Sequence, residues 1–321
     1  MTKSITNRFI RWLTGVHPDP VGVYWGRDGL CLVRLPVQTA GGALMAQCVY
    51  EASALGVTVE NLTSALGQLR QSQVHLSVAL PADEVIVRSM RVPVGLSDLQ
   101  IEQIAIVEAV TNIPVPPEEI CLDFLRADRV PLEGDEIVQL AFCRRERIDQ
   151  VLACAEEANV QVAIVDRDMQ AIHDVVVRHL LGAVCEAPEV YPFAVLLMAV
   201  EPRVLFCMGE IDISSCLIRS NSQEGDPVRW HADIIEQISV CWTRIKLAQL
   251  AGDKRLQRVV YLEAGIVDPL DAFEAAMRLS LDCPVSRLPP VNALLSLLPT
   301  VTEVPEEAAL IALGMAIRKP R

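Results

Sequence analysis

The sequence lacks a segment that could span a membrane. No stretch of the 321 residues approaches the roughly 18 uninterrupted apolar residues that a spanning helix requires. The strongest candidate, FAVLLMAV at 193–200, is followed directly by Glu201, Pro202 and Arg203. The first residues also lack the long apolar core of a secretory signal. These absences argue against a membrane-spanning chain and against a secretory signal.

A basic surface is also missing. The formal net charge is −13 at pH 7, whereas a nucleic-acid-binding protein normally carries a basic stripe. We therefore expect no nucleic acid as a partner. An acidic chain would suit a basic partner, although acidic solvated surfaces are common.

The cysteines and histidines lack the spacing of a metal or catalytic site. No two cysteines form a CxxC pair, no histidine cluster lies near them, and no Ser/His/Asp or Cys/His arrangement stands at a readable spacing. Most cysteines fall in apolar runs, where a free thiol packs as a small apolar group and indicates a reducing compartment. We expect no metal. The ten positions are Cys31, Cys48, Cys121, Cys143, Cys154, Cys185, Cys207, Cys216, Cys241 and Cys283.

The composition suits a large packed core, since 51% of the residues are apolar and 21% are charged. VGVYWGRDGLCLVRL at 21–35 predicts two strands joined by a tight turn. Thr58 is an expected N-cap for a helix over 58–72, and 74–81 reads as a strand buried on both faces. The segment 84–93 alternates and predicts a half-buried strand.

The next stretch predicts an α+β unit. Ser97 and Gln100 form a capping box for a helix over 97–110, and the prolines at 114, 116 and 117 prevent it from continuing. A hairpin over 119–130 and 136–145 and a helix over 146–159 are expected to follow. A buried strand at 160–168 then returns to the first lobe.

The second half repeats the order of the first, with strands followed by helices. Strands are expected at 193–200, 203–210, 213–220 and 258–265, and helices at 233–250, 271–281 and 306–317. We therefore predict two related α/β lobes facing a cleft. The predicted division is an N-terminal segment 1–18, a first lobe 19–80 plus 161–187, an α+β insert 81–160, and a second lobe 188–321.

The N-terminal segment can form an amphipathic helix. Its apolar residues Ile5, Phe9, Trp12 and Leu13 can share one face, with Arg8 and Arg11 beside it. This face could rest on a membrane surface or dock on the body of the protein.

The insert carries motifs that resemble those of the PilM family, the actin-like cytoplasmic proteins of type IV pilus assembly. The segment from about 85 to 125 resembles that family's insert most strongly. VQVAIVDRDMQAI at 160–172 and IALGMAIR at 311–318 are similar to its return strand and closing helix. The matching positions are Val92-Pro93, Leu96-Ser97, Glu102, Glu108, Ile113-Pro114, Pro117-Glu118-Glu119 and Leu122-Asp123-Phe124.

This resemblance implies a bilobal actin-like α/β fold of the FtsA and PilM type, with ribonuclease H-like lobes and an inserted α+β subdomain. It implies a cytoplasmic scaffold at the inner membrane that binds the N-terminal peptide of a PilN-type membrane protein. Pilus assembly and retraction ATPases are further expected partners, and membrane association is expected to be indirect. The alternatives are an active actin-like ATPase of the same machinery, or a component of a type II secretion, DNA-uptake or MSHA-type system.

The nucleotide loops depart from the family pattern. Where the family has Asp-Ile-Gly, this chain has Tyr24, Trp25 and Gly26, and tyrosine cannot replace a carboxylate at a Mg²⁺ site. The second loop, at 196–206, also lacks Asp-Ile-Gly. Gly26, Arg27 and Gly265 are the remaining candidate contacts for a nucleotide, although Arg27 is equally a solvated turn residue. We expect no enzymatic activity and no tight binding of ATP with Mg²⁺. The alternative is weak nucleotide binding without hydrolysis, through backbone contacts near Gly26 and Gly265.

The resemblance places the partner peptide in a groove between the first lobe and the insert. Its expected contacts are Val87, Arg88, Arg91, Ile104 and Glu108, and the peptide would be extended, apolar and mildly basic. Val87 and Ile104 have an alternative role in the core of the insert.

Two acidic residues follow the return strand. Asp166 and Asp168 could bring an acid toward the cleft, while Asp168 could instead cap the following helix.

Overall fold

The fold is described from a computed structural model. It describes residues 20–35, 47–53, 56–69, 74–126, 135–176, 192–198, 202–208, 211–218, 227–247, 255–263, 270–287 and 304–318. The predicted N-terminal amphipathic segment and Gly265 lie outside these residues.

The first lobe is built on a five-stranded sheet in which β1 pairs antiparallel with β2, and β2 with β3, while β4 and β8 run parallel to β1. Helix α1 (Val59–Gln68) packs on this sheet, and Thr58 forms the predicted N-cap as part of a capping box with Asn61. In spatial order the strands are β3 (Gln47–Ala52), β2 (Gly29–Arg34), β1 (Pro20–Trp25), β4 (His75–Leu80) and β8 (Gln161–Arg167).

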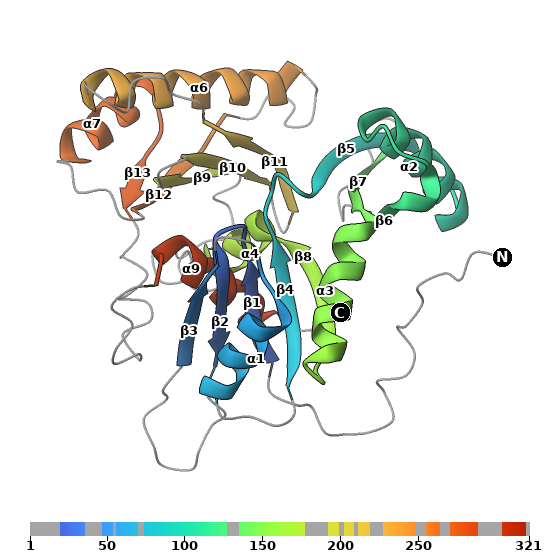
Figure 1. Ribbon diagram of the computed structural model, residues 1–321. Coiled ribbons are helices and arrows are strands. Elements are labelled where there is room, and N and C mark those ends of the chain that lie inside the picture. The colour runs from blue at the N-terminus through green and yellow to red at the C-terminus, as the bar shows by residue number, and fades with distance from the viewer. Residues whose placement is uncertain are drawn as a thin grey trace, which may run out of the picture.

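The second sheet repeats this pattern, with an antiparallel meander of three strands followed by two parallel strands. Helices α6 (Pro227–Leu247) and α7 (Leu270–Leu281) lie along its outer side (Figure 1). The short β13 was not predicted from the sequence. In spatial order the strands are β11 (Ile211–Leu217), β10 (Arg203–Met208), β9 (Phe193–Met198), β12 (Arg258–Glu263) and β13 (Val285–Arg287).

Helices α4 (Asp168–Val175) and α9 (Glu306–Ile317) lie between the two sheets (Figure 1), and their apolar residues form one core with side chains from both. Two glycines permit the close packing of α9. A Cβ at Gly22 of β1 would stand 1.9 Å from the carbonyl oxygen of Ala312, and one at Gly314 would stand 2.2 Å from that of Ala171. The predicted division counted α9 with the second lobe, but this close approach packs it against the first sheet.

The insert is a three-stranded antiparallel sheet with one helix on one face. Helix α2 (Asp98–Asn112) begins at the predicted capping box of Ser97 and Gln100. The 3₁₀ helix η1 (Pro117–Glu119) leads into the predicted hairpin. In spatial order the strands are β5 (Ile86–Pro93), β7 (Asp135–Arg144) and β6 (Ile120–Arg126).

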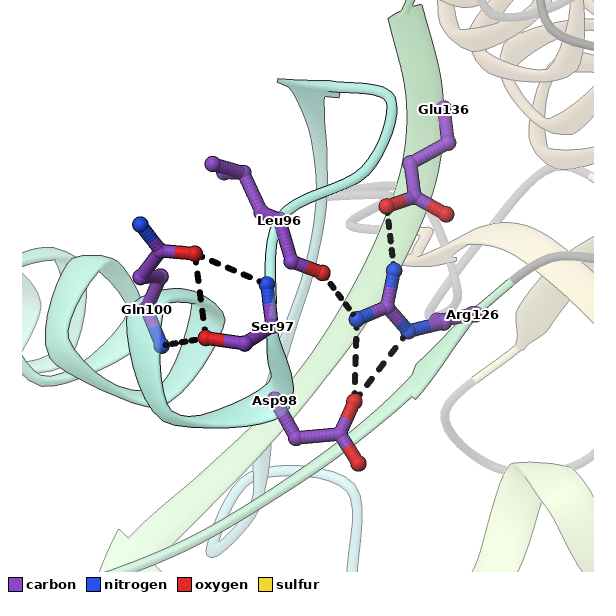
Figure 2. A network of polar contacts seen from close by, with 6 residues as sticks. All are labelled: Leu96, Ser97, Asp98, Gln100, Arg126 and Glu136. Atoms are coloured by element: carbon purple, nitrogen blue, oxygen red, sulfur yellow. Dashed lines mark hydrogen bonds and ion pairs between the residues drawn. The ribbon is translucent and has the colours of Figure 1, made fainter.

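Arg126 fixes the start of α2 to the sheet (Figure 2). Its guanidinium group donates to Asp98 at 2.9 Å, to the carbonyl oxygen of Leu96 at 2.7 Å, and to Glu136 of β7. The carboxylate of Asp98 also lies in the first turn of α2, where the helix dipole favours negative charge. The network orients α2 along one face of the sheet.

Helix α3 (Arg145–Glu157) joins the insert to the first lobe. Val151 and Ala155 are buried in the core of the first lobe, so α3 packs with that lobe rather than with the predicted insert 81–160. Arg145 donates to the carbonyl oxygens of Glu118 and Ile120 at 2.7 and 3.0 Å, and Arg147 pairs with Glu84. These contacts hold the insert against α3.

Candidate functional site

The opening hairpin places its two aromatic residues on opposite sides of the first sheet. Side chains alternate along a strand, so Trp25 enters the core beneath α1 and is fully buried, while Tyr24 points toward the contact between the lobes. Burial raises the pKa of the Tyr24 hydroxyl well above its ordinary value, and the carboxylates of Asp168 and Glu307 raise it further. A neutral phenol therefore stands where the resemblance to the PilM family implies a metal-site acid.

Asp168 connects the two lobes. Its fully buried carboxylate accepts the amide hydrogens of Ala82 and Met169, at 2.9 and 2.5 Å. It also pairs with the Arg203 guanidinium of the second sheet at 2.7 Å. The interpretation of Asp168 as the cap of the following helix was wrong, because Arg167 is the N-cap residue and makes no side-chain capping hydrogen bond, while Asp168 is the first residue of α4. The contact of Asp168 with Arg203 was not foreseen.

Arg203 lies at the start of β10, in the region where the sequence lacks the second Asp-Ile-Gly. It also pairs with Glu307 of α9 at 3.6 Å. Although burial lowers the pKa of Arg203, the neighbouring carboxylates of Asp168 and Glu307 raise it above its ordinary value. Sequence reasoning missed Arg203 and Glu307, because only the fold brings residues 168, 203 and 307 together.

Two of the predicted nucleotide contacts, Gly26 and Arg27, lie in the turn after β1. Arg27 is exposed and pairs with Asp83. The amide of Gly26 donates to the carbonyl oxygen of Gly29 at 3.0 Å, which closes the turn. A Cβ at Gly26 would stand 2.8 Å from the ring of Tyr24, so this glycine makes room for the tyrosine.

Asp166 has a separate structural contact. It pairs with Arg318 at the end of α9, and Arg318 also lies 3.8 Å from Asp174 of α4. Asp166 thus helps to hold α9 against the first lobe. Among the residues that the structure describes, no group of three or more His, Cys, Asp or Glu side chains could hold a metal ion.

The five predicted partner contacts do not share one surface of the insert. Ile86, Met90 and Val92 point toward α2, so Val87 and Arg91 lie on the opposite face of the sheet. Ile104 lies on α2 and is 37% exposed. The sheet therefore separates Val87 and Arg91 from Ile104.

Arg88 and Glu108 are both joined to Asn112, on the α2 side of the sheet. Arg88 donates to Asn112 at 3.2 Å, and Asn112 donates to the carboxylate of Glu108 at 3.1 Å. These contacts link β5 to the last turn of α2.

We call the side of the insert sheet opposite α2 the outer face. It includes Val87 and Arg91 of β5, Ile137 and Gln139 of β7, and Leu125 of β6. The side chains of these residues are half-buried or exposed. In the described sheet β5 pairs only with β7, although β11 of the second sheet also contacts it.

A hollow of about 620 Å³ lies where the insert meets α3, with Glu119, Arg144 and Asp149 in its lining. Cys121 lies on the outer face, and its thiol interacts electrostatically with Arg145 and Asp149, which line the hollow. The hollow and the outer face are therefore neighbours. Burial is the main cause of the raised pKa of the Cys121 thiol. Together the two features form a surface between the insert and α3.

Comparison with solved structures defines the class of the fold. The structure of the "PilM-PilN type IV pilus biogenesis complex" has a TM-score of 0.64, with 18% sequence identity over 93% of this chain and 98% of that chain. The predicted actin-like α/β fold, with its two mixed sheets, is confirmed.

Comparison with family models gives a match to part of the chain. The model described as "Type IV pilus assembly protein PilM" matches residues 41–187, a range that contains the whole insert. The predicted resemblance to the PilM family is confirmed over this region.

Two further structures are similar at TM-scores below 0.5, and neither supports a conclusion. One is the cytoplasmic domain of EpsL, an inner membrane component of the type II secretion system of Vibrio cholerae. It has 13% identity over 76% of this chain and 82% of that chain, with a TM-score of 0.45. The other is a Bacteroides thetaiotaomicron protein with an actin-like ATPase fold, at 9% identity over 87% and 95% and a TM-score of 0.49.

A search of curated proteins gave no match. Within the described part of the chain, no helix is both long and apolar enough to cross a bilayer.

Proposed function

We propose that this chain is a non-enzymatic scaffold of a type IV pilus assembly platform. It acts in the cytoplasm at the inner membrane, and it binds the cytoplasmic N-terminal peptide of a PilN-type membrane protein. The proposal is supported by the PilM family match at 41–187 and by the similarity to a structure that contains PilM and PilN.

The observation that carries the binding proposal is the surface formed by the outer face and the hollow beside α3. Its strand β5 is at the edge of the insert sheet, so an extended peptide could add main-chain hydrogen bonds there. Val87 and Leu125 offer apolar contacts, while Glu119 and Asp149 offer carboxylates to a mildly basic peptide. This surface lies between the first lobe and the insert.

The contact between the lobes supports the non-enzymatic part of the proposal. Mg²⁺ prefers charged oxygen ligands, but Tyr24 offers only a neutral hydroxyl. The nearby carboxylate of Asp168 is already paired with Arg203. A nucleotide with its metal would have to displace this buried ion pair.

The binding proposal is tested by titrating the N-terminal peptide of a PilN-type protein against this chain. We expect Leu125→Asp and Val87→Asp to weaken binding by about tenfold or more, because an added carboxylate would be buried against the peptide. Leu125 is 42% exposed, so its variant should fold normally even if the Val87 variant does not. Val107→Asp, on the other side of the insert, is the matched control.

Equal binding to the wild type and Leu125→Asp would show that the peptide binds elsewhere. Absence of binding to the folded wild type would contradict the scaffold function itself.

The non-enzymatic proposal is tested by calorimetric titration with ATP, with and without Mg²⁺. We expect no tight binding in either condition. Micromolar affinity that depends on Mg²⁺ would contradict the proposal and favour an active ATPase.

A further inference from the structure

Helix α2 has apolar residues on two opposite faces. Ile101, Ala105 and Ala109 are buried against the insert sheet. Leu99, Ile106, Val107 and Val110 are 64%, 37%, 68% and 37% exposed, respectively. At 100° per residue these four fall on the side of the helix turned away from the sheet. We call them the α2 stripe.

An exposed apolar stripe of this length is unusual for a surface helix, whose outward side is normally polar. The packing of the insert does not require it, because the three buried residues already supply the contact with the sheet. Such patches mark interaction sites on soluble proteins.

The charge around the α2 stripe is mainly acidic, although Arg126 pairs with Asp98 at the start of α2 and Arg88 contacts Asn112 at its end. Asp98, Glu102 and Glu108 are the charged residues of α2, which contains no lysine or arginine. Glu118 follows in η1 and is exposed. The stripe is therefore an apolar surface with an acidic border.

We propose that the α2 stripe binds an amphipathic helix of a partner protein, one with an apolar seam bordered by lysine and arginine. The seam would pack on Leu99, Val107 and Val110, and the basic side chains would face the acidic border. A second copy of this chain fits less well, because two acidic borders would face each other and repel.

This surface is distinct from the one proposed for the PilN-type peptide. Val87 and Leu125 point away from α2, so the insert sheet lies between the two surfaces. Both partners can therefore be bound at once. The insert would then act as an adaptor between a membrane-protein peptide on one side and a cytoplasmic helix on the other.

The test uses the full chain and a synthetic 15-residue helical peptide of leucine and lysine, with leucines at helical spacing along one side. We expect measurable binding at low salt and a loss of affinity as salt is raised, because the flanking contacts are ionic. Val107→Asp should weaken binding by about tenfold or more. Leu279→Asp, which changes a leucine that is 85% exposed on α7, should leave it unchanged.

A peptide with glutamate in place of lysine should bind much more weakly. Equal affinity for the wild type, Val107→Asp and Leu279→Asp would overturn the proposal, because it would show attraction to the acidic protein in general. A concentration-dependent dimer in sedimentation that Val107→Asp abolishes would assign the α2 stripe to a second copy and also overturn it.

Failure of this inference is separate from failure of the proposed function. The Val107→Asp variant should still bind the PilN-type peptide, and Leu125→Asp should still bind the leucine–lysine helix.

Discussion

Between the lobes, Asp168 is fully buried and paired with Arg203, whereas on the insert the side chain of Val107 is 68% exposed. The lobes satisfy their polar groups with one another. The insert instead leaves apolar side chains uncovered on α2 and a strand edge without a pairing partner in the described sheet. In this protein, the buried ion pair holds the two lobes in a fixed relation. The exposed apolar side chains of α2 and the edge of the insert sheet are suited to binding partners.

The pair between Asp168 and Arg203 is a direct contact between the two lobes. Arg203 belongs to the second sheet and Asp168 to the start of α4, and apolar residues of α4 and α9 complete the contact. The guanidinium group of Arg203 pairs directly with the carboxylate of Asp168.

The largest effect is expected from Asp168→Ala. Removing one partner of a buried ion pair leaves the other charge uncompensated, which typically costs about 3–5 kcal/mol. Because Glu307 remains 3.6 Å from Arg203, we expect a loss of about 3 kcal/mol in the free energy of unfolding, near the lower end of that range. Chemical denaturation measures it.

Asp83→Ala is the matched control, because Asp83 pairs with Arg27 at an exposed site. Its expected change is within about 0.5 kcal/mol. Equal stability of the two variants would mean that the ion pair between Asp168 and Arg203 contributes no more to folding than the exposed pair between Asp83 and Arg27.

A smaller effect is expected from Ser97→Ala in the insert. Ser97 accepts the amide hydrogen of Gln100 at the start of α2, and loss of an N-cap typically costs about 1 kcal/mol. Amide hydrogen exchange across α2 should speed up accordingly, while exchange in α4 should not change. Equal acceleration in both helices would mean that the insert does not open independently.

The smallest effect is a change in pH dependence. Burial raises the pKa of Asp168 above its ordinary value of 3.8, although Arg203 and the amides of Ala82 and Met169 oppose this. The folded state therefore binds more protons than the unfolded state in the window above pH 3.8. The resulting stabilisation is complete below that pH and is lost as the pH rises through the raised pKa.

Denaturation of the wild type and Asp168→Asn between about pH 3.5 and 6 tests this. The wild type should lose stability relative to the variant as the pH rises. Parallel curves would mean that the carboxylate titrates normally in the folded protein.

Local patterns predicted many of the elements correctly. The capping residues Thr58 and Ser97 fixed where α1 and α2 begin, because a cap depends on residues three positions apart. The alternation at 84–93 likewise predicted the half-buried β5. Short-range rules succeeded where both partners are close in the sequence.

The sites were harder to predict, because they depend on which residues meet across elements. The sequence indicated that Tyr24 replaces an acid, but not that Arg203 would reach Asp168 from 35 positions away. It also grouped Val87 with Ile104, although the sheet separates them. Strand register decides which side of a sheet a residue occupies, and register follows from pairing with distant strands.

By itself, the sequence determined the order of most elements, the caps of α1 and α2, the missing nucleotide-loop motifs and the family to which residues 41–187 are matched. These depend on residue type and on short spacings. The tertiary structure alone decided that α9 returns to the first sheet at Gly22, that Arg203 pairs with Asp168, and that α2 turns a second apolar side outward. These depend on which surfaces meet when distant segments pack, and spacing along the chain does not encode that meeting.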